Sequence, residues 1–361
     1  MSERRAPSAD LSFAGRVVAW QTQHGRHALP WQNTRDPYRI WLSEIMLQQT
    51  QVATVLAYYE RFTARFADVR ALAAADLGAV LAAWSGLGYY SRARNLHRCA
   101  QLVVSDHGGQ FPTTSAALAL LPGIGRSTAA AIAAFCFGER VAILDGNVKR
   151  VLARVLAFEG DLAEGPAERE LWAVATALLP ARGIGSYTQG LMDLGASVCT
   201  PRSPHCLLCP AREVCAAASA GTQERYPIKS RRLVRGRRDN VWLELRWKGA
   251  VRLVERGPSG VWAGLWSLPE LASMEAFEAM SAGWPGSAET LDPFVHALTH
   301  FDWHLRPVRW TFPSRTSASA LESLLAAWPG GCWLTNEEAL ALGLPAPLRK
   351  RLLQIEATAG A

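Results

Sequence analysis

Residues 121–137 have the sequence LPGIGRSTAAAIAAFCF, in which a turn separates two helical patterns. Gly123 and Gly125 favour a tight turn, because glycine adopts positive φ without a steric penalty. Such a turn directs free N–H groups outward at the start of the second helix, where the helix dipole also favours an anion. A nucleic-acid phosphate would fit there, but an ordinary pair of helices joined by a short turn shows the same pattern.

The pattern on both sides of this turn is helical. Apolar residues recur at three-to-four spacing, and few strand signals interrupt them. This spacing predicts helices over residues 11–24, 37–50, 52–66, 76–84, 91–107, 115–120, 128–137 and 166–179. The sequence therefore predicts an all-α domain over residues 1–220.

The composition changes after this domain. Residues 221–240 are rich in arginine and predict a basic linker, which would be either a plain solvated connector or a segment attractive to phosphates. From residue 241 the apolar period becomes two, and Lys248-Gly249 offers a turn between two strands. Further strands over residues 295–298 and 305–311, with helices over 274–280 and 320–328, predict an α+β domain over residues 241–361.

Bulk composition limits the classes of protein without choosing one. The chain has 361 residues, 49% of them hydrophobic, which suffices for two packed domains and excludes global disorder. Its net charge of +7 suits a polyanionic partner, although solubility alone would explain it. Without an apolar run of membrane-spanning length or a signal-peptide pattern at the start, we expect a cytoplasmic protein.

Four of the seven cysteines crowd into one short segment with the spacing Cys199-x6-Cys206-x2-Cys209-x5-Cys215. Thiols this close are typical of a metal site in a reducing compartment, not of a disulfide framework. The ligand type allows either zinc or an iron–sulfur cluster, and the residues alone do not decide between them.

Two carboxylates stand in sequences that suit acid–base chemistry. On a helix, Glu44 shares its face with Trp41 and Leu47, and a carboxyl group against apolar neighbours has a raised pKa. A surface glutamate would show the same pattern. Asp145 precedes a helical pattern, which predicts an N-cap residue whose backbone hydrogen bonds keep it ionised. An ionised carboxylate is what a developing cation requires.

These segments resemble the helix-hairpin-helix superfamily of DNA glycosylases, and specifically the adenine DNA glycosylase family. The resemblance covers most of residues 11–220 and rests on four segments, which are 41–51 (WLSEIMLQQTQ), 86–90 (GLGYY), 121–130 and 143–150 (ILDGNVKR). It implies a six-helix module over about residues 31–135 and a cluster module built from residues 1–30 and 136–220. The cysteine spacing is similar to the [4Fe–4S] loop of these enzymes. The proline common before the essential aspartate is Ala142 here, which implies a less rigid loop.

The resemblance implies a chemistry for the carboxylates. Glu44 protonates adenine at N7, so that the base leaves as a neutral molecule, and later activates water. Asp145 stabilises the oxocarbenium-like sugar by charge or by transient covalent capture, and Asn147 orients the sugar or Asp145. The implied partner is double-stranded DNA in base excision repair, with adenine opposite 8-oxoguanine and less readily opposite guanine. The base must leave the helix first.

The resemblance also assigns DNA contacts in the helical domain. Gln48, Gln49 and Tyr89 would enter the duplex near the lesion, with Tyr89 as a wedge. A tyrosine flanked by glycines otherwise packs against a turn. The hairpin with Gly123, Gly125 and Ser127 would hold a phosphate.

The C-terminal residues 258–269 and 296–301 resemble the Nudix-like domain of adenine glycosylases. That domain recognises 8-oxoguanine through a Phe-Ser-His segment, and the segment here is Leu298-Thr299-His300. Thr299 and His300 are therefore candidate lesion contacts, although the aromatic residue is absent. A helix dense in Glu and Arg, which Nudix hydrolysis needs for Mg²⁺, is also absent from this sequence, so we do not expect that activity.

Two other interpretations stay open. Endonuclease III shares the implied fold and cluster but excises oxidised pyrimidines, using a lysine in the hairpin that forms a Schiff base. Ser127 takes that place here and cannot form an imine, which predicts a monofunctional glycosylase. The second alternative is a non-catalytic lesion-binding protein, against which the presence of Glu44 and Asp145 argues.

We expect a monomer associated with the nucleoid through DNA, and the sequence indicates no protein partner.

Overall fold

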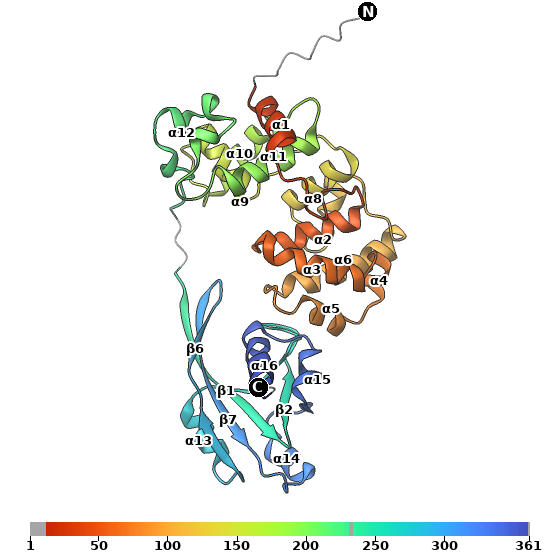
Figure 1. Cartoon of the computed structure of the whole chain (residues 1–361), viewed down its shortest axis with the longest axis vertical. Coiled ribbons are helices and arrows are strands. Elements are labelled where there is room, and N and C mark those ends of the chain that lie inside the picture. The colour runs from red at the N-terminus through yellow and green to blue at the C-terminus, as the bar shows by residue number, and fades with distance from the viewer. Residues whose placement is uncertain (1–11, 231–233, 360–361) are drawn as a thin grey trace, which may run out of the picture. The chain divides into compact units, whose positions relative to one another are not determined.

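The computed structural model describes residues 12–230 and 234–359, shown in Figure 1. Its contacts divide the chain into two compact units. The first comprises Met1–Tyr59, Phe66–Ala73 and Arg98–Arg232, and the second comprises Glu60–Arg65, Ala74–His97 and Leu233–Ala361. The second unit thus combines the C-terminal sheet with two stretches of the helical region. The predicted domain and module boundaries stay a prediction.

The predicted all-α character of the N-terminal region is confirmed. Several helices begin at a residue whose side chain accepts a hydrogen bond from the first turn, as Ser12, Asp36, Asp76 and Asp145 do. The α-helices of this region are α1 (Phe13–His24), α2 (Pro37–Leu47), α3 (Val52–Arg65), α4 (Val69–Ala74), α5 (Leu77–Trp84), α6 (Ser91–His107), α7 (Ser115–Leu118), α8 (Arg126–Ile132), α9 (Gly146–Val155), α10 (Gly165–Ala177), α11 (Ile184–Ser197) and α12 (Ala216–Ser219).

The helical region differs from the sequence prediction in several details, among them the short helices α4 and α12, which were not predicted. The helix predicted over residues 128–137 begins earlier, at Arg126, and its last part, Ala133–Phe137, is a π-helix that ends at Gly138 with φ +71°. Helix α11 was not predicted, because Gly190 and Gly195 break its apolar pattern. These glycines allow close packing: a Cβ on Gly195 would lie 2.6 Å from the Cβ of Asn147 on α9.

The C-terminal region is α+β, as predicted. Its strands form one sheet with the order β3-β2-β1-β7-β5, in which β1 and β7 run parallel from the pair Gly236↔Phe301 to Arg246↔Thr311. The strands are β1 (Gly236–Trp247), β2 (Ala250–Glu255), β3 (Trp266–Ser267), β4 (Glu270–Leu271), β5 (Ser287–Thr290), β6 (Phe294–Ala297), β7 (Phe301–Thr311) and β8 (Cys332–Leu334), and the helices are α13 (Met274–Ser281), α14 (Ala318–Leu324), α15 (Asn336–Leu340) and α16 (Ala346–Ala359).

Strand β1 begins within the predicted linker. Residues 236–240 are strand because they pair with the first residues of β7, which itself begins at Phe301 and not at residue 305. Residues 231–233 of the predicted linker lie outside the described residues. None of the helices in the described part of the chain is long and apolar enough to span a membrane.

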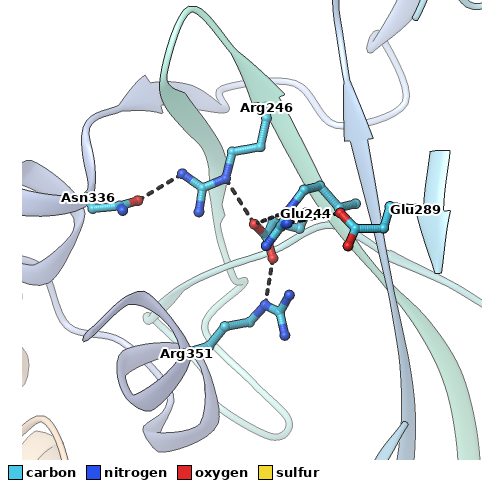
Figure 2. A network of polar contacts seen from close by, with 6 residues as sticks. Glu244, Arg246, Glu289, Asn336 and Arg351 are labelled. Atoms are coloured by element: carbon cyan, nitrogen blue, oxygen red, sulfur yellow. Dashed lines mark hydrogen bonds and ion pairs between the residues drawn. The ribbon is translucent and has the colours of Figure 1, made fainter. Parts of the chain in front are cut away.

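A network of charged side chains joins α16 to the sheet (Figure 2). Glu244 on β1 is buried and accepts hydrogen bonds from Arg309 on β7 (2.9 Å) and Arg351 on α16 (2.5 Å). Arg246 donates to the same carboxylate (2.9 Å) and to Asn336 (2.8 Å). Burial alone would raise the pKa of Glu244, but the positive charges of Arg351 and Arg246 outweigh it and lower that pKa.

We predict that Gly195→Ala destabilises the protein. The new methyl group would overlap Asn147 at 2.6 Å and push α11 from α9, and overpacking of this kind costs about 1–3 kcal/mol. Urea unfolding of both proteins measures the change. Gly185→Ala, on the same helix, is the matched control: its methyl group would meet its nearest atom, Phe135 Cδ1, at 3.9 Å, so its free energy of unfolding should not fall. Equal effects of the two substitutions would contradict the packing argument.

Candidate active site

Glu44 lies in the last turn of α2 and lines a cavity of about 210 Å³. Its helix is anchored by buried apolar residues, among them Trp41 and Met46, so the backbone at Glu44 has little freedom. Burial raises the pKa of Glu44 from its ordinary value of 4.5 to about 8, and the negative charge of Asp145 adds to the rise. The raised pKa expected from its apolar neighbours is therefore confirmed, and at neutral pH this carboxyl group holds its proton.

Asp145 is the N-cap of α9, as predicted, and its carboxylate accepts a hydrogen bond from the Val148 N–H over 2.7 Å. The expectation that capping keeps its pKa low was wrong. Burial raises the pKa of Asp145, and the hydrogen bonds from Val148 and Asn147 together with the charges of Arg150 and Lys149 only oppose that rise. The structure thus brings Glu44 and Asp145 within range of each other's charge, although among the described residues Asp145 is not one that lines the cavity.

Three polar anchors hold the loop that leads to Asp145. Glu139 accepts hydrogen bonds from the backbone N–H (2.6 Å) and hydroxyl (2.7 Å) of Ser115. Arg140 donates to the carbonyl groups of Leu179 (2.7 Å) and Pro180 (2.9 Å). At the end of the loop, the Leu144 N–H donates to the Ser127 hydroxyl over 3.1 Å. We expected a less rigid loop because Ala142 replaces a proline, but these hydrogen bonds restrain the loop.

A neighbouring arginine holds the side chain of Asn147 in place. Its side-chain oxygen accepts a hydrogen bond from Arg150 over 2.7 Å, and Arg150 also donates to the carbonyl group of Gly195. The backbone N–H of Asn147 donates to Asp145. Of the two roles predicted for Asn147, the structure therefore supports a contact with Asp145 through the backbone.

The cavity beside Glu44 contains polar residues that the sequence prediction missed. Arg26 and Gln189 both line it, and Asp193, which is 1% exposed, binds them. Asp193 accepts hydrogen bonds from Arg26 Nε (2.7 Å) and from Gln189 Nε2 (2.9 Å). A buried carboxylate thereby fixes a cation and an amide at the wall of the cavity. Arg26 and Asp193 are 167 residues apart, and no local pattern connects them.

The hairpin around Gly123 has the expected turn but differs at its second glycine. Gly123 is left-handed with φ +76°, whereas Gly125 is the extended N-cap of α8 with φ −80°. Gly125 is exposed, and a Cβ there would meet no atom within 4 Å. Ser127 is half-buried and holds the Asp145 loop through Leu144, which gives it a structural role that the phosphate prediction did not include.

The other predicted DNA contacts lie in both units. In the first, Gln48 donates to the Thr128 hydroxyl over 3.4 Å beside the hairpin, and Gln49 is exposed with φ +54°. In the second, Tyr89 has φ +49° and is 46% exposed, and Thr299 and His300 are exposed between β6 and β7. Positive φ is rare outside glycine and persists where the surroundings enforce it.

The four clustered cysteines line one cavity together with Val151, Leu194 and Val198. None of them forms a disulfide bond. Burial raises the pKa of Cys209 to about 11, and the charges of the other three thiols add to the rise. Among the described residues there is no group of three or more His, Cys, Asp or Glu that could hold a metal ion.

Buried Arg154 braces the cysteine loop. Its guanidinium donates to the Cys199 sulfur (3.3 Å) and to the carbonyl groups of Thr200 (2.6 Å) and Pro201 (3.1 Å). Its Nε donates to the carbonyl groups of Gln223 and Tyr226. One side chain on α9 therefore connects the start of the cysteine segment with the residues that follow its end.

Comparison with known proteins gives matches for both parts of the chain. Residues 42–176 match the model of HhH-GPD superfamily base excision DNA repair proteins, and residues 241–354 match that of the NUDIX domain. The adenine DNA glycosylase of Buchnera aphidicola subsp. Schizaphis graminum is 31% identical over 94% of this chain and 97% of its own length. The human adenine DNA glycosylase is 42% identical over 59% of this chain and 40% of its own length.

Two solved structures are similar to the helical region. A thermostable thymine-DNA glycosylase is 29% identical with a TM-score of 0.52, and the match covers 58% of this chain and 95% of that one. A non-covalent endonuclease III–DNA complex matches the same shares with a TM-score of 0.50, but its identity of 19% shows the fold alone.

We predict that Glu44→Gln removes a pH dependence from the stability of the protein. The folded wild type keeps a proton on Glu44 up to about pH 8, whereas the unfolded chain releases it near pH 4.5. Raising the pH through this range therefore lowers the free energy of unfolding of the wild type relative to the variant. Urea unfolding at pH 5 and pH 8.5 measures the difference. Glu60→Gln, at an exposed position, serves as the control, and its free energy of unfolding should change between the two pH values as much as that of the wild type. An equal change in Glu44→Gln would contradict the prediction.

Proposed function

Because the chain belongs to the adenine DNA glycosylase family, we propose that it releases adenine mispaired with 8-oxoguanine, and more slowly adenine mispaired with guanine. The enzyme is an adenine DNA glycosylase of base excision repair. The observation that carries the proposed mechanism is the raised pKa of Glu44, which lines a cavity. Burial and the nearby charge of Asp145 raise that pKa to about 8. The finer choice of mispair rests on the resemblance of the sequence to this family.

Glu44 is the proposed proton donor. Adenine leaves poorly as an anion, and a proton on N7 converts it into a neutral leaving group. A general acid works best when its pKa lies near the working pH, and the pKa of Glu44, about 8, meets that condition. Once the base has left, the deprotonated Glu44 would accept a proton from the attacking water. The polar wall of Arg26 and Gln189 would hold the extruded base.

Asp145 is the proposed partner of the sugar cation. As positive charge develops on the deoxyribose, a fixed carboxylate stabilises it through space or by transient bonding to the anomeric carbon. The hydrogen bonds from Val148 and Asn147 and the nearby charges of Lys149 and Arg150 favour its ionised form. We propose that Asp145 acts in its ionised form, which these groups favour against the opposing effect of burial.

The cysteine cavity is the proposed site of a [4Fe–4S] cluster. Each thiolate of such a cluster binds a different iron, so the ligands surround a cavity instead of converging on one point. The arrangement of Cys199, Cys206, Cys209 and Cys215 around one cavity fits that requirement, and Arg154 would offset part of their negative charge. When bound, the cluster would hold the loop in shape, and it takes no part in the proposed base release.

DNA binding is proposed to involve both units. The exposed N-terminus of α8 at Gly125 would hold a phosphate, and Gln48, Gln49 and Tyr89 would enter the duplex. Thr299 and His300 would meet 8-oxoguanine, with Leu298 in the place of the aromatic residue. Ser127 has no amine for a Schiff base, so we propose a monofunctional enzyme; borohydride trapping equal in amount to base release would contradict this.

We predict an order of reactivity among three duplexes under single-turnover conditions. Wild type should release adenine fast from A:8-oxoguanine, more slowly from A:G and negligibly from A:T. Glu44→Gln cannot deliver the proton and should be at least about 100-fold slower on the first two. Binding of A:8-oxoguanine DNA by the variant should persist, which separates lost chemistry from lost folding. Preferential release of an oxidised pyrimidine by the wild type would contradict the proposed substrate.

We predict that protein purified without oxygen carries iron and sulfide in equal amounts, on the order of four of each per chain. Metal analysis and visible absorption measure this. Cys206→Ser should lose most of the iron, whereas Cys332→Ser, which lies outside the cluster segment, should keep it. A colourless preparation with one zinc per chain would contradict the iron assignment and show that these four thiols bind zinc instead.

A further inference from the structure

The turn that carries Tyr89 is tied to its own helices by hydrogen bonds within the second unit. Trp84 Nε1 donates to the carbonyl oxygen of Gly88 over 3.1 Å. Arg92 Nη2 donates to the carbonyl oxygens of Leu87 (3.0 Å) and Gly88 (3.2 Å), and its guanidinium also lies 5.6 Å from the centre of the Tyr89 ring. These contacts fix the turn between α5 and α6, where Tyr89 has its positive φ and exposed ring.

Both ends of this turn also bind a single carbonyl group from the C-terminal part of the chain. The Ser85 hydroxyl donates to the carbonyl oxygen of Leu344 over 3.0 Å, and the Tyr90 hydroxyl donates to the same atom over 2.5 Å. The Tyr90 oxygen in turn accepts a hydrogen bond from the Gly86 N–H at 3.2 Å. Ser85, Tyr90 and Leu344 are buried, so the two bonds to the Leu344 carbonyl oxygen are sheltered from water.

The backbone around Leu344 packs closely on α5. A Cβ on Gly343 would lie 3.0 Å from the Cβ of Leu81, which is tighter than ordinary packing allows. Nearby, Arg94 on α6 donates to the carbonyl oxygen of Ala263 over 2.8 Å. The Leu344 carbonyl therefore has a defined place against the turn, set by packing on one side and hydrogen bonds on the other.

We propose that the Leu344 carbonyl group positions the DNA-entering turn, and that Ser85 and Tyr90 are the positioning residues through which it acts on Tyr89. The inference rests on the proposed role of Tyr89 as a wedge. A wedge unstacks bases only if its backbone resists the displacement, because a loose turn would yield before the DNA does. The C-terminal domain would thus help to open the duplex, in addition to recognising the lesion.

Tyr90→Phe tests this in the full-length protein, because it removes the hydroxyl group and keeps the ring. We expect adenine release from an intact A:8-oxoguanine duplex to slow about 3- to 10-fold, which is the order of effect for losing the hydrogen bonds of one hydroxyl group. The fluorescence of 2-aminopurine next to the mispair, which rises on unstacking, should reach a lower plateau. Release from a duplex with adenine opposite an abasic site, in which the adenine is already unpaired, should keep the wild-type rate. Gly343→Ala should reproduce this pattern from the other side of the contact.

Tyr38→Phe is the matched control, since its buried hydroxyl also donates to a backbone carbonyl group, that of Phe66, over 2.6 Å. It should lose similar stability and leave the fluorescence plateau unchanged. In a Tyr89→Ala background, Tyr90→Phe should cause no further slowing, because the wedge through which it acts is gone.

Three outcomes overturn the inference. The first is a wild-type plateau for Tyr90→Phe, and the second is equal slowing of that variant on the intact and the pre-opened duplex. The third is full additivity with Tyr89→Ala, which would show a merely structural role. If Tyr89→Ala alone leaves release from the intact duplex unchanged, the proposed wedge function itself is wrong and the inference falls with it.

Discussion

The active site depends on an unfavourable arrangement, in which two half-buried carboxyl groups lie within range of each other's charge. Charge in apolar surroundings costs free energy unless it is neutralised or hydrogen-bonded. The two groups meet this cost in different ways. Glu44 keeps its proton, because burial and the charge of Asp145 both raise its pKa, whereas Asp145 receives backbone N–H groups at the start of α9. The environments of the two neighbouring carboxyl groups therefore differ, and such differences separate the roles of acid and anion in enzymes.

This division holds only if the backbone at each carboxyl group stays in place. Apolar packing fixes α2 around Glu44, while Asp145 ends a loop without regular structure that polar anchors hold at Glu139, Arg140 and Ser127. A proline would make such a loop rigid by restricting φ, but Ala142 cannot. Hydrogen bonds to groups outside the loop replace the lost restriction. Ser127 thus links the hairpin turn to the loop that ends at Asp145.

The sequence predicted those features that depend on neighbouring residues. The helices, the N-cap at Asp145 and the existence of strand β1 are local, although residues 241–245 of β1 are all buried and do not alternate as their sequence suggests. The apolar neighbours of Glu44 on its helix correctly indicated its raised pKa. Features set by distant parts of the chain were missed or wrong. Asp193 orients Arg26 across 167 residues, and β1 extends to Gly236 only because β7 pairs with it. The pKa of Asp145 was misjudged for the same reason: the cap is local, but the burial that outweighs it comes from the whole fold.

A comparison of buried Glu244 with half-buried Glu44 shows what sets the direction of a pKa shift. Glu244 is 1% exposed, yet its pKa is lowered, because Arg246, Arg309 and Arg351 surround it. Glu44 has an aspartate as its charged neighbour, and its pKa rises. Burial penalises the charge of both, so it is the sign of the neighbouring charge that lowers the pKa of one and adds to the rise in the pKa of the other. The anion in turn fixes Arg351 on α16, the helix that begins at Ala346, directly after the segment whose carbonyl group holds the turn of Tyr89.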